Sequence, residues 1–207
     1  MKTLKLGKDD FKKRENSYLS YYIGAENIAD FDGHLEIEGD LGWVFFESVK
    51  VAGNLGIKAG SGIEARWGIE AGEGIKAGSG IKAGWGIKAG SGIKAGSGIE
   101  AGSGIEAGEG IEAGEGIKAG WGIKAGLFIT CKLTLKVLYR VFAGICTWRQ
   151  TVDDDAKTIT CGKFEGGNIE YGILKEIGLP TEKPVKTLSG KKVKVEIDGV
   201  NYSATIE

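Results

Sequence analysis

The single histidine, His34, is the first candidate for proton-transfer chemistry in this sequence. A histidine acts as a general base when a cleft holds it beside a nucleophile or a substrate hydroxyl. His34 instead lies in an acidic stretch, 32–40, where nothing in the sequence indicates such a cleft. With one histidine, Ser–His–Asp triads and metal sites built from several histidines are nearly excluded. We therefore predict a surface histidine in a terminal cap and no catalytic residue.

Other side chains that bind metals or cofactors are present but lack the required spacing. The run 153–155 holds three aspartates that could bind a divalent cation, but no glycine-bearing calcium loop surrounds it, so we predict a solvated turn. Cys131, Cys146 and Cys161 are odd in number and form no CxxC pair, which indicates reduced, mostly buried thiols. G-x-G recurs without the GK[ST] ending of a phosphate loop. We predict no metal and no cofactor.

The elements that must position any functional side chain are set by a repeat. Glycine accounts for 37 of the 207 residues and proline for only 2, and most of the glycines belong to a six-residue unit, G-I-[KE]-A-G-x. Isoleucine recurs every sixth residue from Ile57 to Ile129, and alanine follows two residues later from Ala59 to Ala125. A period of six does not match the 3.6 of a helix, but it suits strands. Strict repetition at this period predicts a β-solenoid.

Strand alternation predicts the direction of each side chain in the unit. Isoleucine and alanine face inward, and the lysine or glutamate between them faces water. We expect the two glycines around x to adopt positive φ and turn a corner that points x outward. If three units, or eighteen residues, complete a rung, Trp67, Trp85 and Trp121 fall in one column with Ser103 between the last two. The prediction is therefore a three-sided coil.

The same stacking predicts what the surface displays. Two charge columns alternate in sign, with each glutamate beside lysines, and a third column is a lysine ladder that internal stability does not favour. The columns read Glu64, Lys82, Glu100, Lys118; Glu70, Lys88, Glu106, Lys124; and Lys58, Lys76, Lys94, Glu112. Aromatic corners and unneutralised lysines are plausible partner anchors, although packing against the caps and a solvated charged face are the alternatives. The candidate binding residues are Trp67, Trp85, Trp121, Arg66, Lys58, Lys76, Lys94, Lys82 and Lys88.

The repeat resembles the hexapeptide-repeat β-helix proteins, which form triangular and usually left-handed coils of eighteen residues. Leu135 and Val141 continue the isoleucine period downstream, and Phe45 and Val51 fall on phase upstream. That family usually places its small residue two before the aliphatic one, whereas alanine comes two after it here. The resemblance implies left-handedness and an acyltransferase as an alternative function. The G-I-x-A-G run followed by RVFAGICTW, 140–148, also resembles repeat proteins of bacterial prophages.

The sequence divides into three parts. Residues 1–44 are predicted to form an N-terminal cap, with a tyrosine cluster at 18–22 and strand-like spacing from Leu35 to Trp43. The repeat domain spans 45–143. Residues 144–207 are predicted to form a C-terminal β-rich module that closes the solenoid, with hairpins at 147–160 and 193–206. The fold class is thus an all-β, three-sided β-solenoid of eighteen residues per rung, with an N-terminal cap and a C-terminal hairpin-rich module.

The charge balance and the hydropathy of the sequence limit the classes of binding partner and the cellular compartment that we expect for this protein. Lysine and arginine number 27 against 28 acidic residues, so the chain as a whole is not a basic nucleic-acid binder. Nucleic acid could meet the lysine ladder, but it is not favoured over protein. No apolar stretch is long enough to span a membrane, and the first residues do not form a secretory leader. A cytoplasmic protein is expected, in the host cytoplasm if it is phage-encoded.

These observations favour a non-catalytic binding protein, a rigid β-solenoid that presents charged and aromatic surfaces to a protein partner. The prophage resemblance extends this to a phage-encoded inhibitor of a host enzyme or of a defence system such as CRISPR. The alternatives are a diverged hexapeptide-repeat acyltransferase and a self-assembling structural solenoid that forms homo-oligomers. Ice binding is disfavoured because almost every unit exposes a lysine or a glutamate.

Overall fold

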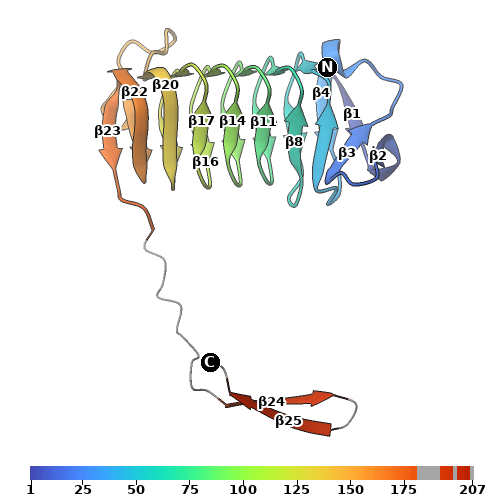
Figure 1. Ribbon diagram of the computed structural model, residues 1–207. Coiled ribbons are helices and arrows are strands. Elements are labelled where there is room, and N and C mark those ends of the chain that lie inside the picture. Colours follow the sequence, from blue (N-terminus) through green and yellow to red (C-terminus); the bar gives the residue numbers. More distant parts are fainter. Residues whose placement is uncertain (181–191, 198–199, 206–207) are drawn as a thin grey trace.

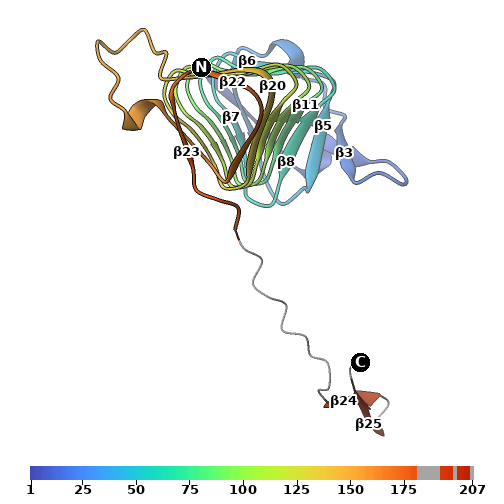
Figure 2. The same ribbon diagram turned by 60° about the vertical axis from the view of Figure 1, so that its left-hand side comes forward.

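The computed structural model describes residues 1–180, 192–197 and 200–205, and it shows an all-β coil whose rungs stack along one axis (Figure 1). The coil has about 18 residues per turn and about 8 turns, which confirms the predicted β-solenoid. In the described part of the chain the only helices are three short 3-10 turns, Lys8–Asp10, Ile28–Asp30 and Asp155–Lys157. Seen obliquely along the axis, the rungs overlie one another as nested loops (Figure 2).

Three faces run along the coil, and we call them A, B and C in the order in which the chain visits them. Face A is a sheet of nine strands: β1 (Lys2–Leu6), β4 (Gly33–Ile37), β7 (Leu55–Ile57), β10 (Ile75–Ala77), β13 (Ile93–Ala95), β16 (Ile111–Ala113), β19 (Ile129–Cys131), β21 (Thr158–Cys161) and β23 (Ile173–Glu176). Face B holds β2 (Phe11–Lys13), β3 (Leu19–Tyr22), β5 (Trp43–Phe46), β8 (Gly62–Ala65), β11 (Ile81–Ala83), β14 (Ile99–Ala101) and β17 (Ile117–Ala119).

Face C holds β6 (Val49–Val51), β9 (Ile69–Ala71), β12 (Ile87–Ala89), β15 (Ile105–Ala107) and β18 (Ile123–Ala125). Two longer strands, β20 (Thr134–Ala143) and β22 (Lys163–Tyr171), pass around the edge between faces B and C and join them into one sheet. Strands within each face pair in parallel, except that β2 lies antiparallel to β3.

The core consists of identical residues stacked from rung to rung. Ile87 pairs with Ile69 on one side and Ile105 on the other, and the alanine two residues later does the same with its own neighbours. These side chains are fully buried, whereas the charged residue between them faces water. Burial of one isoleucine is worth about 1.5–3 kcal/mol, so a single rung cannot offset its own ordering and must be stabilised by its neighbours.

The corners are built differently from the prediction, because no glycine of 62–126 has positive φ. The glycine after each alanine is required for another reason. A β-carbon on Gly90 would lie 1.9 Å from the carbonyl oxygen of Gly72 in the preceding rung. The glycine before each isoleucine is less constrained, since a β-carbon on Gly86 would lie 3.4 Å from the carbonyl oxygen of Gly104. Close stacking therefore disfavours a side chain at the first glycine of a corner, although Arg66 occupies this position in one corner. The second glycine has more room, except at Gly116 and Gly122, where a β-carbon would lie 2.9 and 2.7 Å from a carbonyl oxygen.

The first rungs are longer than eighteen residues. Leu55, not Ile57, pairs with Ile75, and Ile57 pairs with Ala77, so this rung is two residues longer. The added length forms a wider corner at Gly60 (φ +86°). Ala59 is consequently exposed, contrary to the inward direction that the period predicts.

A buried serine holds the wider corner. The Ser61 hydroxyl donates to the Gly39 carbonyl oxygen at 2.9 Å and accepts from the Leu41 amide at 2.8 Å. The same shift of register affects face B, where Val44 pairs with Ile63 and is buried. Phe45 pairs with Glu64 and points outward, so its predicted inward phase is wrong.

The coil extends beyond the repeat at its N-terminal end. Within 1–44, β1 pairs with β4 and β3 pairs with β5, so most of this segment builds turns of the coil. Strand β2 departs from the parallel pattern, and Phe11 on it packs edge to face against Phe46 and Tyr22. These rings close the N-terminal end of the core.

Beyond the repeat at the C-terminal end, β21, β22 and β23 add further strands to the faces. The segment 147–160 is not the predicted hairpin: residues 147–152 form no strand, and β21 pairs in parallel with β19. The second predicted hairpin is confirmed for β24 (Lys192–Ile197) and β25 (Val200–Thr205), which pair in antiparallel fashion. Its predicted turn, 198–199, and Ile206 lie outside the described residues.

Candidate binding surface

The three tryptophans form one column along the edge between faces B and C, as the period predicts. The Trp85 amide donates to the Trp67 carbonyl oxygen at 2.8 Å, the Ser103 amide to Trp85 at 2.8 Å, and the Trp121 amide to Ser103 at 3.0 Å. The Tyr139 amide then donates to the Trp121 carbonyl oxygen at 2.8 Å. We call these five residues the aromatic edge. Tyr139 was missed in the sequence analysis, although it lies eighteen residues after Trp121.

The side chains of the aromatic edge are open to solvent. The exposed fractions of Trp67, Trp85, Trp121 and Tyr139 are 46%, 60%, 63% and 58%. The rings of Trp67 and Trp85 contact each other edge to face, and Arg66 beside them forms an ion pair with Glu47 at 3.2 Å. The edge is therefore an exposed row of rings on a backbone that hydrogen bonds hold at every corner.

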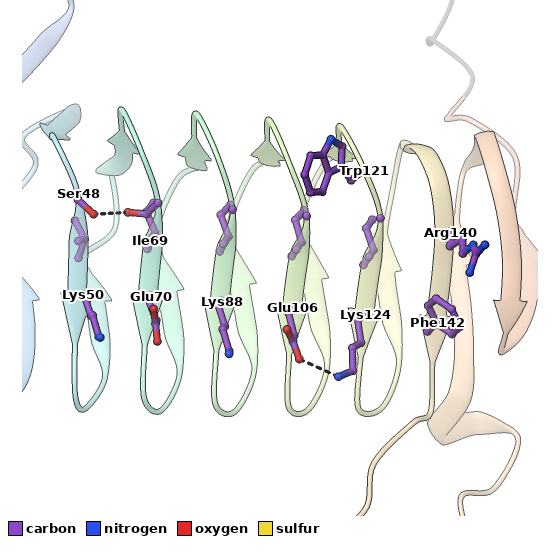
Figure 3. Close-up of a pocket in the computed structure, with 18 of the residues that line it drawn as sticks. Ser48, Lys50, Ile69, Glu70, Lys88, Glu106, Trp121, Lys124, Arg140 and Phe142 are labelled. Atoms are coloured by element: carbon purple, nitrogen blue, oxygen red, sulfur yellow. Dashed lines mark hydrogen bonds and ion pairs between the residues drawn. The ribbon is translucent and has the colours of Figure 1, made fainter. Parts of the chain in front are cut away.

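Face C carries a groove of about 620 Å³ that borders the aromatic edge (Figure 3). Its floor contains the glycines that precede the isoleucines, and Trp121 and Tyr139 line it on the side of the edge. Lysines and glutamates line the other side, and Arg140 and Phe142 lie toward its C-terminal end (Figure 3). The floor glycines are Gly68, Gly86, Gly104 and Gly122.

The groove floor offers mainly apolar contact. The Ile69 amide donates to the Gly86 carbonyl oxygen at 3.0 Å, and the Ile87 amide to Gly104 at 3.1 Å. These backbone groups bond along the coil axis rather than toward the groove. The floor therefore offers no free strand edge for β-strand addition, and only the shape of the groove and the side chains on its two walls are available for contact.

The two alternating charge columns are confirmed by the register. Lys82 lies between Glu64 and Glu100 on face B, and Lys88 lies between Glu70 and Glu106 on face C. Each closed ion pair joins only two neighbours: Lys118 to Glu100 at 2.6 Å and Lys124 to Glu106 at 2.9 Å. The hydrogen bond from Lys118 lowers the pKa of Glu100. Such exposed pairs contribute about 0–1 kcal/mol each to the free energy of unfolding. Their main effect is to set the distribution of charge on the surface.

The predicted lysine ladder is only partly formed. Gly56, not Lys58, pairs with Lys76, and the Lys58 ammonium lies 3.6 Å from the carboxylate of Glu38. The wider corner before Ser61 moves Lys58 out of the column. Lys76 pairs with Lys94, which in turn forms an ion pair with Glu112 at 2.5 Å. Lys82 and Lys88 lie on faces B and C, so the candidate lysines do not meet in one patch.

His34 lies on β4 and does not line the face C groove. Its Nδ1 accepts a hydrogen bond from the Asn54 amide at 2.9 Å, and the Glu73 carboxylate is 3.9 Å away. Asn54 also donates from its side chain to Glu73. The histidine therefore ties neighbouring rungs together.

The aspartates of 153–155 make local contacts within their turn, and two of the three cysteines are buried in the core. Asp153 accepts the Ala156 amide at 2.7 Å, and Asp154 forms an ion pair with Lys157 at 2.8 Å. Among the described residues no group of three or more potential metal ligands comes together. Cys131 and Cys161 are buried in the core, and burial raises the pKa of their thiols to about 12 and about 11.

No protein-family model matches the chain, and neither a curated protein nor a solved structure is significantly similar to it. The resemblances to hexapeptide-repeat and prophage proteins stay predictions. Over the described residues, no helix has the length and apolar character needed to cross a membrane.

Proposed function

We propose that this protein is a non-catalytic binding protein whose aromatic edge and face C groove together bind a protein partner. The observation that carries the proposal is the row of exposed rings beside an elongated groove. Exposed aromatic side chains are enriched at the energetic centres of protein interfaces, and a contiguous apolar surface rimmed by charges is typical of an interaction site.

The rigidity of the coil supports this function. Backbone hydrogen bonds join each residue of the aromatic edge to its neighbour in the edge, so the backbone that carries the rings has a fixed spacing before a partner arrives. A preorganised surface loses little conformational entropy on binding. The prophage resemblance predicts that the partner is a host enzyme or a defence protein in the host cytoplasm, and this identity is part of the proposal.

The charge pattern favours a protein over a nucleic acid. Along face C the outward residues alternate as Glu70, Lys88, Glu106 and Lys124, so the groove has no continuous positive wall for a phosphate backbone. Nucleic-acid binding depends on several phosphates being neutralised together. An alternating row instead complements a polypeptide that carries both signs.

Affinity capture with matched variants tests the proposal. Tagged protein is incubated with a lysate of the source cells, and bound proteins are identified by mass spectrometry. We expect one stoichiometric partner that the double variant Trp85→Ala/Trp121→Ala loses. Trp148→Ala is the control, because Trp148 is equally exposed but lies outside the aromatic edge. A partner retained by the double variant, or no stoichiometric partner, contradicts the proposal.

Self-association through the C-terminal end is a second candidate that a specific observation favours. In the described chain β23 pairs only with β21, and its outer edge carries exposed Ile173 and Leu174, followed by exposed Ile177 and Leu179. An uncovered strand edge with apolar side chains is a template for pairing with another chain. Light scattering across a hundredfold concentration range tests it: a mass that stays at one chain, 21.8 kDa, excludes this role.

A further inference from the structure

Each face carries a column of glycines in the position before the isoleucine. At Gly68, Gly86 and Gly104 stacking does not impose glycine, because a β-carbon there would lie 3.3–3.4 Å from the next rung's carbonyl oxygen. At Gly122 it would lie 2.7 Å from the Arg140 carbonyl oxygen, so glycine is required at this end of the column. The repeat nevertheless keeps glycine here throughout faces A, B and C. The columns leave a flat strip of bare backbone on each face.

On two faces the chain covers part of this strip with its own aromatic ring. Trp43 occupies the glycine position at the start of the face B column, and its ring lies over the next two glycines. A β-carbon on Gly62 would be 3.1 Å from Trp43 Cδ2, and one on Gly80 would be 2.7 Å from Cη2. On face A, Phe128 occupies the same position at the other end of the column, and a β-carbon on Gly110 would be 2.5 Å from its Cζ. The strip thus accepts a flat ring.

Face C lacks such a ring. The positions equivalent to Trp43 and Phe128 at the ends of its column are Ser48 and Arg140. The atoms nearest to β-carbons placed on Gly68, Gly86 and Gly104 are backbone carbonyl oxygens of the next rung, with no side chain within 4 Å. This uncovered strip is the floor of the groove that Trp121 and Tyr139 border (Figure 3).

We propose that the strip Gly68–Gly86–Gly104 on face C is the docking site for an aromatic side chain of the protein partner. The ring lies flat on the glycine backbone as Trp43 does on face B, and the Trp121 indole flanks it. This inference rests on the proposed binding function and names the chemistry that the groove recognises. The occupant is assigned as a protein aromatic because Trp43 and Phe128 are the chain's own examples of it. The charge row beside the strip alternates in sign, which suits a polypeptide.

A titration with small probes tests the site without the partner. Amide chemical shifts of ¹⁵N-labelled full-length protein are followed as N-acetyl-tryptophanamide is added, with N-acetyl-leucinamide as the matched non-aromatic probe. We expect saturable shifts at the amides of Gly68, Gly86 and Gly104 and at the Trp121 indole, with a Kd of ~1 mM, typical of so small a ligand. The leucine probe should bind at least tenfold more weakly.

Two substitutions separate the face C strip from the rest of the coil. Gly86→Phe supplies a ring as Phe128 does on face A, and it should weaken probe binding at least tenfold. Gly98→Phe makes the same change on face B, where a β-carbon has almost the same clearance, 3.3 Å, and it should leave the face C shifts unchanged. If Gly86→Phe fails to fold, Ser48→Trp replaces it, since it copies the position of Trp43 without altering a repeat glycine.

Several outcomes overturn the site. If the leucine probe binds as tightly as the tryptophan probe, the strip has no preference for aromatic rings. If adenosine binds more tightly than the tryptophan probe, the strip is a nucleobase site instead. Shifts confined to faces A or B, or no shifts, remove the site altogether. A failed titration leaves a partner captured through the aromatic edge intact, whereas a failed capture leaves a measured probe site intact, so the two proposals fail separately.

Discussion

The indole rings of Trp67 and Trp85 meet edge to face, with centroids 5.1 Å apart and planes inclined by 81°. The two residues are eighteen apart in the sequence, and the hydrogen bond from the Trp85 amide to the Trp67 carbonyl oxygen places them on adjacent rungs. The contact joins two turns of the coil on the outside, where the core isoleucines do not reach. The ring pair therefore links the stability of the coil to the surface proposed to bind.

A double-mutant cycle on this pair should reveal a coupling of about 0.5–1.5 kcal/mol, the range found for aromatic pairs. Trp67→Ala, Trp85→Ala and the double variant are compared by urea unfolding. The same cycle on Trp67 and Trp121 is the control, because these residues are three rungs apart and should show no coupling. Equal couplings in both cycles would mean that the ring contact contributes nothing of its own.

The two kinds of corner glycine, Gly90 after an alanine and Gly86 before an isoleucine, should respond oppositely to substitution by alanine. Gly90→Ala forces a β-carbon to within 1.9 Å of the Gly72 carbonyl oxygen, so it should lower the free energy of unfolding by about 3 kcal/mol, at the upper end of overpacking costs. Gly86→Ala has 3.4 Å of clearance and should be neutral or stabilising by up to about 1 kcal/mol, because alanine restricts the unfolded chain. Chemical unfolding of both variants measures the difference. Similar effects at both sites would contradict the steric account of the corner.

The three thiols should react at very different rates. Burial raises the pKa of Cys131 to about 12 and of Cys161 to about 11, and both side chains are enclosed, whereas Cys146 is partly exposed. At pH 8 we expect one fast equivalent with a thiol reagent, and Cys146→Ser should abolish it. Cys131→Ser is the control that leaves the fast phase in place.

The raised pKa values of Cys131 and Cys161 should make the folded protein less stable at high pH. Above about pH 9 the unfolded chain loses protons that the folded core retains, so the free energy of unfolding falls as pH rises toward 11–12. Cys131→Ala should flatten this decline. A decline of unchanged slope in the variant would assign it to other groups.

The Glu100–Lys118 pair should give a pH dependence in acid. The hydrogen bond from Lys118 lowers the pKa of Glu100 in the folded state. The ion pair therefore stabilises the fold fully at pH values above the pKa that Glu100 has in the unfolded chain. That contribution is lost as pH falls through the lower folded value. Carbon-detected NMR titration should show the pKa of Glu100 rising in Lys118→Met.

Lys82→Met is the matched control, because Lys82 also neighbours Glu100 in register but forms no hydrogen bond with it. We expect Lys82→Met to move the pKa of Glu100 less than Lys118→Met does. A larger shift in the control would assign the effect to general charge on face B rather than to the bonded pair.

The repeat predicted the coil from Gly62 to Ala125, whereas at 57–59, where the motif is equally regular, the longer rung breaks the predicted register. A period of six with Ile87 and Ala89 inward requires short strands joined by corners, and the column of Trp67, Trp85 and Trp121 selected eighteen residues per rung. Downstream of the repeat the predicted continuation is confirmed at Leu135 and Val141, which pair with Ile117 and Ile123. Upstream the longer rungs break the period, and Leu55 takes the place of Ile57. Residues 1–44 and 158–176 extend the same sheets with ordinary sequences, because parallel pairing to an existing edge requires inward apolar residues but no repeated motif.

Between 62 and 126 the sequence by itself determined the inward residues, the outward charges and the alignment of the three tryptophans, since strand alternation and the period decide all three. Only the tertiary structure decided that Lys58 leaves its column, because a buried Ser61 holds a wider corner there. It also decided which glycine strips are covered. Whether a ring such as Trp43 lies over glycines nineteen and thirty-seven residues away depends on how neighbouring rungs meet, and no local pattern encodes that contact.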